Sequence, residues 1–418
     1  MTSRPPGRVL SAVAPGLLIA ATGVGAGDLL TAGLAGSVVG LSILWAAWVG
    51  ALLKGFLNEG VARWQLATGT TLLEGWVRHL GRPVEWAFLV YFVAWSFFTG
   101  GALVNACGVA GTALLPLGDD LRGSKILWGA AHSLAGVVLV RLGGYRLFEK
   151  LMAGFIGLMF VSVLATAVLS RPNWAAVFRG LVTPQISSGQ IAWMLGVLGG
   201  VGGTVTLLSY GYWIREEGRE GGTGLRACRV DLSLGYVMTA LFGVSMVVIG
   251  SGVSLERGPL MALDLASQLE EVIGPAGRWV FLVGFWGAVF SSLLGVWQSV
   301  PYLFADFLSI DRSSGRARPR AQDLASTRPY RAYLLALGVV PLPLLWMTVK
   351  QAQLAYAVLG AFFMPFLALT LLIMNNRSGW IGREWKSGWL ANAVLAVTLL
   401  VFAWIGVRQV LATLTNIL

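Results

Sequence analysis

The chain has 418 residues, of which 56% are hydrophobic and only 12% are charged, and its formal net charge is +11. Soluble domains are roughly half apolar and about a quarter charged, so this composition excludes an ordinary soluble protein and indicates an integral membrane protein. The basic residues fall between apolar runs, which excludes the single basic face of a nucleic-acid-binding protein. We therefore expect one membrane domain over residues 1–418, in contact with the lipid bilayer and without a nucleic-acid partner.

Apolar runs long enough to cross a bilayer recur along the whole chain and predict about eleven transmembrane helices. In chain order the runs cover 9–38, 40–62, 84–116, 124–141, 147–169, 190–213, 229–252, 277–305, 331–348, 352–375 and 388–410. Basic residues precede the first run, as they do in a signal peptide. Because that run continues past Gly23, we expect a retained first span rather than a cleaved leader.

Basic clusters follow the second, fourth, sixth and eighth runs, at 63–82, 141–150, 215–229 and 312–331. If the spans alternate in direction, all four clusters lie on one side of the membrane, and the positive-inside rule makes that side cytoplasmic. The sequence therefore predicts a multi-pass protein of the cell's plasma (inner) membrane with a cytoplasmic N-terminus.

Glycine-rich interruptions lie inside the first and sixth runs, at Thr22–Asp28 and Gly199–Thr204. Unwound backbone at membrane depth is stable only where protein or a wet cavity satisfies its polar groups, so paired breaks indicate the substrate site of a transporter. Close helix packing through small residues is the alternative for any single glycine pair. Breaks in the first and sixth spans predict two five-helix repeats of inverted topology, over about 9–169 and 190–375, followed by an extra helix at about 388–410.

Short motifs distributed over most of the chain carry a likeness to a known family. They are Ala14–Gly16, Leu41–Trp45, Ala67–Gly69, Tyr145–Lys150, Gly180–Pro184, Leu195–Gly199, Ser291–Ser292, Pro365–Phe366 and Asn376–Arg377. In these motifs the chain resembles the NRAMP family of proton-coupled divalent-metal transporters. The resemblance implies an all-α integral membrane protein with the LeuT-like fold, inverted five-helix repeats and broken first and sixth helices.

The metal-site motifs of that family are largely replaced. Where the family has Asp-Pro-Gly-Asn in the first span, this chain has Gly25–Asp28, and where the sixth span has Met-Pro-His-Asn, it has Gly203–Thr206. The third-span acid that the family links to proton movement falls in Ser96–Gly100, which contains no carboxylate, and the tenth-span glutamine corresponds to Tyr356 or Ala357. The thioether and imidazole ligands that favour softer metals are therefore absent from these positions.

Asp28 is the acid that lies closest to the two breaks in the sequence. A carboxylate inside a membrane is costly and is functional by default, although Asp28 could also act as an N-cap, a proton carrier or the counter-charge of an organic ammonium. With carbonyls freed at Gly25 and Gly200 it would form a metal site of oxygen ligands, which suits Mg²⁺ or Mn²⁺. The predicted substrate-binding residues are Thr22, Gly25, Gly27, Asp28, Gly200, Gly203, Thr204 and Thr206.

Three further residues are candidates for proton transfer or gating. His132 lies inside the fourth run, where it could shuttle protons or form a hydrogen bond that supports packing. Glu59 and Arg63 are four residues apart on the second run, which is the spacing of a pair on a helix surface.

No nucleotide-binding loop of the type Gly-x-x-x-x-Gly-Lys-Ser/Thr is present, and the glycines at 23–27 do not follow a strand-like segment. We therefore expect neither an enzyme nor a cofactor. The sequence favours a secondary active transporter of NRAMP-like type for a divalent metal ion. One alternative is a proton- or sodium-coupled carrier of an amino acid or organic amine, and another is a non-transporting sensor derived from a transporter.

Overall fold

The computed structural model describes residues 27–142, 160–185, 190–200, 202–252, 274–310 and 324–415, together with positions 154, 157, 263, 266, 267 and 270. Throughout these residues the regular structure is helical and contains no strand. The prediction of an all-α protein is confirmed.

The first half of the described chain contains η1 (Gly27–Ala32, a π-helical turn), α2 (Gly33–Val39), η2 (Gly40–Ile43), α3 (Leu44–Thr68), α4 (Leu72–His79), α5 (Arg82–Leu114), α6 (Leu121–Leu142), α8 (Trp174–Val182), α9 (Ile191–Gly200) and η4 (Val205–Ser209). The second half contains α10 (Tyr210–Glu216), α11 (Gly221–Ser251), α13 (Pro275–Ser309), α15 (Arg328–Val339), η6 (Leu342–Trp346), α16 (Val349–Ala361), α17 (Phe363–Met374), α18 (Ser378–Ile381) and α19 (Trp389–Thr415).

Nine segments of the described chain are long and apolar enough to cross a membrane, or ten if Phe160–Leu169 and Trp174–Val182, which meet at 119°, form one span. The segment Leu29–Thr68 contains the end of the first predicted span and the whole of the second. The first part of the run at 9–38 and much of the run at 147–169 lie outside the described residues. These two facts account for the difference from the predicted eleven spans.

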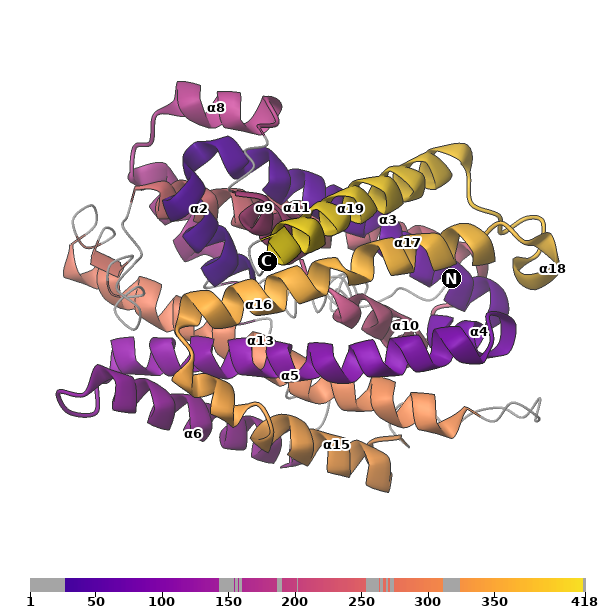
Figure 1. The fold of residues 1–418 in the computed structure, drawn as a ribbon, viewed down its shortest axis with the longest axis horizontal. Coiled ribbons are helices and arrows are strands. Elements are labelled where there is room, and N and C mark those ends of the chain that lie inside the picture. Colours follow the sequence, from indigo (N-terminus) through magenta and orange to yellow (C-terminus); the bar gives the residue numbers. More distant parts are fainter. Residues whose placement is uncertain are drawn as a thin grey trace, which may run out of the picture.

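The long helices form two groups joined by α16 (Figure 1). In one group α11 packs against both α2 and α3, and α9 packs against α3. In the other group α5 packs against α6 and α13, and α13 packs against α15. Helix α16 contacts α9 in the first group and α5 in the second, so it covers the middle of the molecule, while α19 packs along α17.

Glycines allow the closest contacts in the first group. A Cβ atom at Gly36 of α2 would lie 2.3 Å from the carbonyl oxygen of Val247, and one at Gly250 of α11 would lie 2.1 Å from the carbonyl oxygen of Gly33. No larger residue fits at either position without moving the backbone. Small residues therefore set the distance between α2 and α11, as is common where helices pack in membranes.

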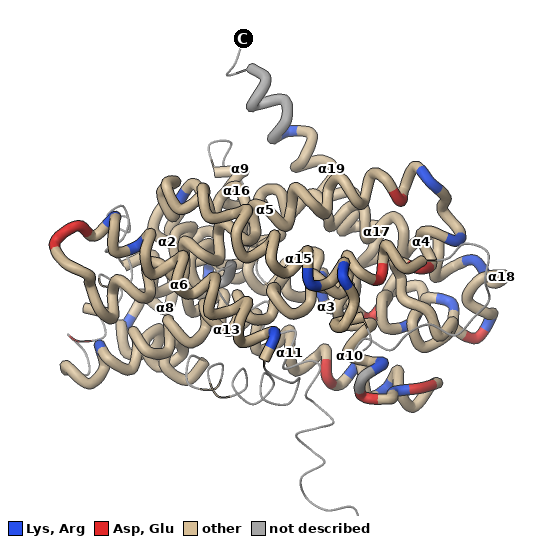
Figure 2. The backbone as a smooth tube through the Cα atoms, turned by 90° about the horizontal axis from the view of Figure 1, so that it is seen from below, with Lys and Arg blue, Asp and Glu red and all other residues tan. Residues whose placement is uncertain are grey.

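Charged residues gather toward the ends of the molecule (Figure 2). The larger collection of Lys, Arg, Asp and Glu lies at the end formed by α4, α10 and α18, and a smaller one lies at the opposite end. Long helices with few charges connect the two ends, as expected where an apolar bilayer core surrounds them.

Candidate functional site

The sixth span is interrupted near its middle. Helix α9 ends at Gly200 and the chain becomes helical again only at Val205, where η4 leads into α10. Gly202 and Gly203 have φ angles of 83° and 84°. Residues with a Cβ rarely adopt this left-handed conformation, so the glycines predicted at the break are the residues that make it possible.

Neighbouring helices enclose the break. Thr204 is fully buried, and the indole Nε1 of Trp95 on α5 donates a hydrogen bond of 2.7 Å to its Oγ1. A Cβ at Gly360 of α16 would lie 2.6 Å from the Cγ2 of Thr204, so only glycine lets α16 pack this closely. Thr206 is also buried, with 6% of its surface exposed.

A buried lysine reaches the break from α3. The Nζ of Lys54 donates a hydrogen bond of 2.6 Å to the carbonyl oxygen of Gly199 in the last turn of α9, and the lysine is only 1% exposed. Its Cδ lies 3.7 Å from the position that a Cβ would take at Gly202. The last four carbonyls of a helix lack intrahelical partners, and Lys54 satisfies one of them at the interruption.

Helix α11 forms another wall of the break. The Cγ2 of Thr239 lies 3.0 Å from a Cβ built at Gly202, and the ring of Tyr236 lies 3.4 Å from it. The Nδ2 of Asn58 donates a hydrogen bond of 3.1 Å to the hydroxyl of Tyr236. On α3, Gly55 leaves room for the same ring, because a Cβ there would lie 3.4 Å from it.

Tyr236 also lines a groove of about 680 Å³ between α3, α11 and the start of α19. Its walls are mainly apolar, with Leu52, Val237 and Leu390 among them, and Glu59 and Arg229 lie at its charged part. The groove and the break therefore share one aromatic residue.

The first-span residues are described only in part. Thr22 and Gly25 lie outside the described residues. Gly27 and Asp28 begin the π-helical turn η1, but the position of the Asp28 side chain is not described. Turn η1 packs against α9 and α16, so this turn lies in the same region as the sixth-span break.

Thr31 of η1 faces α9 beside the break. Its Cγ2 lies 3.2 Å from a Cβ built at Gly196 and 3.9 Å from one built at Gly200. Thr31 is fully buried, and its Oγ1 has no hydrogen-bond partner among the described residues. It is a candidate oxygen ligand that the sequence analysis did not identify.

The third and tenth spans contribute no charged group at Ser96–Gly100 or at Tyr356 and Ala357, the positions that correspond to the family's acid and glutamine. Ala357 of α16 lies 3.5 Å from the Cβ positions of Gly196 and Gly200, so an apolar methyl group faces α9 there. On α5, Ser96 donates to the carbonyl oxygen of Phe92 and accepts a 2.9 Å hydrogen bond from Tyr333. Among the residues that the structure describes, no group of three or more His, Cys, Asp or Glu could hold a metal ion.

A family model described as natural resistance-associated macrophage protein-like, abbreviated Nramp, matches residues 16–412. The chain belongs to this family. It is therefore a membrane transporter of the NRAMP family, and not an enzyme. The family resemblance seen in the sequence motifs is confirmed.

The NRAMP chain is similar to a curated relative and to a solved structure. It is 24% identical over 293 residues to the divalent metal cation transporter MntH of Klebsiella pneumoniae, covering 68% of this chain and 69% of the relative. It is also similar to a crystal structure of a mutant manganese transporter from Eremococcus coleocola, with a TM-score of 0.70, 17% identity, and coverage of 98% of this chain and 89% of the other.

The fold also extends to transporters outside the family. The crystal structure of MhsT in complex with L-phenylalanine matches with a TM-score of 0.58 and 16% identity, covering 96% of this chain and 97% of the other. The LeuT-like architecture predicted for the NRAMP chain is thus confirmed.

His132 lies away from the break, on α6 in the second helix group. Its Nδ1 bonds to the carbonyl oxygen of Trp128 at 2.7 Å, so this nitrogen carries the proton, and its Nε2 accepts a 2.7 Å hydrogen bond from the indole of Trp286. The ring also makes an edge contact with Phe290. Both ring nitrogens are thus used within the protein, which favours the packing role over proton transfer.

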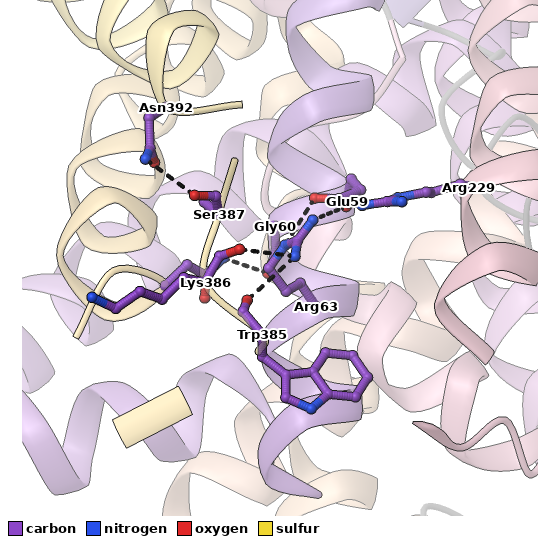
Figure 3. Close-up of polar contacts among 9 residues, drawn as sticks. Glu59, Gly60, Arg63, Arg229, Trp385, Lys386, Ser387 and Asn392 are labelled. Atoms are coloured by element: carbon purple, nitrogen blue, oxygen red, sulfur yellow. Dashed lines mark hydrogen bonds and ion pairs between the residues drawn. The ribbon is translucent and has the colours of Figure 1, made fainter. Parts of the chain in front are cut away.

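Glu59 and Arg63 form the predicted ion pair on α3, and it extends to two further parts of the chain (Figure 3). Arg229 of α11 donates from Nε and Nη2 to Glu59 Oε1, at 3.0 and 2.9 Å. Arg63 also donates to the carbonyl oxygens of Trp385 and Lys386, at 3.2 and 3.3 Å. The pair therefore connects α3 with α11 and with the segment before α19. An ion pair on the surface of one helix would not make these connections.

Two buried acids hold α10, the second half of the broken span. Asp231 accepts a 2.9 Å hydrogen bond from Tyr210 and forms an ion pair of 3.0 Å with Arg219. Asp306 of α13 accepts hydrogen bonds from Tyr212 at 2.6 Å and from Thr71 at 3.2 Å. Both acids are at most 2% exposed.

Lys54 was not among the residues predicted from the sequence, although a signal was present. Lys54 is a charged residue within the predicted span 40–62, and such residues are rare and functional by default. Asp231 lies within the predicted span 229–252 and carried the same signal.

Proposed function

We propose that the protein is a secondary active transporter that carries a divalent metal ion across the plasma membrane, with the ion bound at the break between α9 and η4. The observation that carries the proposal is the buried interruption at Gly202 and Gly203 within an NRAMP-family fold. Backbone groups freed at membrane depth need partners, and an ion in transit can be one of them.

The candidate ligands at the break are oxygen atoms, and they determine which ion we propose. The sixth span offers the carbonyl of Gly200, the backbone at Gly203 and the buried hydroxyls of Thr204 and Thr206. In the proposal the first span contributes Thr22, Gly25, Gly27 and Asp28. Carbonyl, hydroxyl and carboxylate oxygens suit Mn²⁺ or Mg²⁺, and without a thioether the site discriminates weakly between these two ions.

The names of the relatives support a metal substrate, since one is called a divalent metal cation transporter and the other a manganese transporter. In our proposal transport proceeds by alternating access around the two breaks and is coupled to protons or sodium, with Asp28 as the candidate proton carrier. In this proposal the end formed by α4, α10 and α18, where the larger collection of charged residues lies, faces the cytoplasm. A cytoplasmic N-terminus is part of the same proposal.

The attachment of α10 suits a gate at the cytoplasmic side. Tyr210 and Tyr212 tie α10 to Asp231 and Asp306, which belong to α11 and α13. In the proposed cycle this end stays closed while those hydrogen bonds persist and opens when α10 leaves one of the acids. The buried acids make the closed arrangement specific, since a buried carboxylate that loses one of its hydrogen-bond donors is costly.

A flux assay in proteoliposomes tests the proposal. We expect Mn²⁺ and Mg²⁺ to enter at similar rates, faster than in protein-free liposomes, and the variant Thr204→Val to slow both ions. A strong preference for Cd²⁺ would contradict the oxygen site. If no divalent ion moves, metal transport is wrong for this protein.

A second candidate function is a proton- or sodium-coupled carrier of an amino acid or organic amine, of which an amino acid fits better. The observation that favours it is the buried ammonium of Lys54 beside the break, because such a group can attract a carboxylate. The same liposomes loaded with radiolabelled amino acids separate the two candidates. Flux of neither metal nor amino acid would favour the non-transporting sensor.

A further inference from the structure

We infer that Lys54 is a tethered cation, which occupies the negative end of α9 and lowers the affinity of the break for free cations. This inference rests on the proposed function only in placing the substrate at the break. Lys54 is then a residue that determines cation specificity. Its ammonium group competes with a free ion for the end of α9.

The end of α9 is a natural position for a cation. Aligned peptide dipoles place about half a negative charge at the C-terminus of a helix, on carbonyls that lack intrahelical partners. Helix α9 ends at Gly200, within a span and beneath other helices, where bulk water does not screen that charge. A positive group is therefore favoured there, whether it arrives as an ion or belongs to the protein.

The packing of α3 against α9 delivers the ammonium group to this position. A Cβ at Gly50 would lie 2.7 Å from the carbonyl oxygen of Leu198, so glycine lets the two backbones come close. Lys54 is one turn further along the same face of α3. From there its Nζ reaches the carbonyl oxygen of Gly199, one residue after the close contact.

A neutral residue could satisfy that carbonyl without the cost of burying a charge. Asparagine, glutamine and serine all donate hydrogen bonds, whereas a buried ammonium inside a membrane is expensive. Lys54 is 1% exposed, and its Nζ donates a hydrogen bond to the carbonyl oxygen of Gly199. Compared with an uncharged residue that donates to the same carbonyl, Lys54 adds a positive charge at the end of α9.

The charge of Lys54 has a consequence for the transported ion. A metal ion that approached the carbonyl of Gly199 would meet the like charge of the ammonium at close range. The ion is then bound on the side of the break that faces η1, where Thr31 lies. In the proposed function the first-span ligands are on that side as well. Removal of the charge should open the end of α9 to free cations, including Na⁺.

The test compares Lys54→Met and Lys54→Gln with the wild type. Methionine keeps an unbranched apolar side chain without charge, and glutamine keeps a neutral hydrogen-bond donor. The thermal unfolding of the purified full chain is followed while Na⁺, Mg²⁺ or Mn²⁺ replaces choline at constant ionic strength. We expect both variants to bind at least one of these cations about tenfold more tightly than the wild type, seen as a cation-dependent rise in Tm.

Lys125→Met is the matched control. Lys125 is also buried, 4% exposed, and its Nζ also donates to a main-chain carbonyl, that of Met347, at 2.9 Å. It lies on α6, in the other helix group, and its second acceptor is Asn105. We expect Lys125→Met to respond to cations as the wild type does. An equal gain in this control would mean that any buried lysine has the effect, and it would overturn the inference.

The remaining outcomes also decide the question. If Lys54→Met and Lys54→Gln respond to cations as the wild type does, Lys54 is not a substitute for an ion. If Lys54→Gln folds normally while Lys54→Met fails to fold in every salt, Lys54 is a structural cap and the inference is wrong. Failure of both variants to fold in every cation overturns it as well. Failure of metal flux in the wild type would remove the proposed function but leave this comparison valid, because the comparison needs no transport.

Discussion

The indole Nε1 of Trp95 lies 2.7 Å from the hydroxyl oxygen of Thr204, and this hydrogen bond connects α5 to the residue at the end of the sixth-span break. It joins the two helix groups at the point where the backbone is least regular. The indole N–H takes one lone pair of the Thr204 oxygen and so directs the other. Trp95 is therefore a positioning residue for a hydroxyl that we propose as a ligand.

Replacement of Trp95 by phenylalanine should weaken both the fold and metal binding. The change leaves the buried oxygen of Thr204 without its donor, at an expected cost of about 0.5–2 kcal/mol in the free energy of unfolding. We expect a lower Tm and a lower apparent affinity for Mn²⁺ in the flux assay. Trp48→Phe is the control, because the Trp48 indole also donates to the protein, to the carbonyl of Leu181, but is 40% exposed. An unchanged Mn²⁺ affinity in Trp95→Phe would show that the orientation of Thr204 does not matter.

Gly202→Ala should reduce transport far more than it reduces stability. Gly202 has a φ of 83°, which costs a residue with a Cβ roughly 1–2 kcal/mol, and the added atom would lie 3.0 Å from Thr239. Gly118→Ala is the matched control, because Gly118 has a φ of 81° but no atom within 4 Å of its Cβ position. We expect Gly202→Ala to lose somewhat more Tm than Gly118→Ala, because its added methyl group meets Thr239, and we expect a loss of flux only in Gly202→Ala. If Gly202→Ala and Gly118→Ala transport the ion at equal rates, the break is not part of the transport pathway.

The span pattern and the sixth-span break were predictable from sequence because each depends on local information. A run of apolar residues defines a span, and glycines such as Gly202 and Gly203 define where a helix can leave regular geometry. The partners of polar side chains were not predictable in the same way. Lys54 and Gly199 are 145 residues apart, and no local pattern connects them.

The same limit applies to the candidates that the sequence did identify. Glu59 and Arg63 were recognisable as a pair from their spacing of four residues, but the contribution of Arg229 comes from a helix 170 residues away. His132 was recognisable as an isolated intramembrane histidine. Its partner Trp286 lies on another helix, 154 residues away, and it is this bond that favours packing over proton transfer.

Glu59→Gln should destabilise the protein more than Arg229→Gln does. Glu59 accepts from both arginines, and its loss leaves Arg63, whose side chain is 8% exposed, without a carboxylate partner in the described region. Arg229 is 53% exposed, so its bond to Glu59 is screened by solvent and contributes roughly 0.2–1 kcal/mol. The measurement is the Tm of each variant at low and high salt.

Arg226→Gln is the control for this pair of variants, because Arg226 is an exposed arginine on the same helix as Arg229. We expect it to leave the Tm unchanged at either salt concentration. An Arg229→Gln variant that loses as much stability as Glu59→Gln would mean that solvent does not screen this contact.

The protein should lose some stability as the pH falls below neutrality, and His79 should contribute to the loss. His79 lies after the second span, its ring stacks on Trp380 at 4.5 Å, and partial burial together with the charge of Arg78 lowers its pKa below 6.5. A histidine whose pKa is lower in the folded state binds fewer protons when folded than when unfolded. Its contribution is therefore complete above pH 6.5 and declines as the pH falls from 6.5 toward the lowered pKa.

His79→Phe separates this contribution from that of other groups. Phenylalanine can keep the stack on Trp380 but cannot take up a proton, so we expect the fall in Tm between pH 8 and pH 5 to be smaller in the variant than in the wild type. The Arg377 guanidinium also lies over the Trp380 ring, 4.5 Å from its centroid, and a protonated His79 would add a second cation on the same indole. Arg377→Gln should then lessen the pH dependence as well, but less than His79→Phe does, because the histidine remains. If His79→Phe and the wild type lose the same Tm over this range, His79 does not titrate as its surroundings indicate.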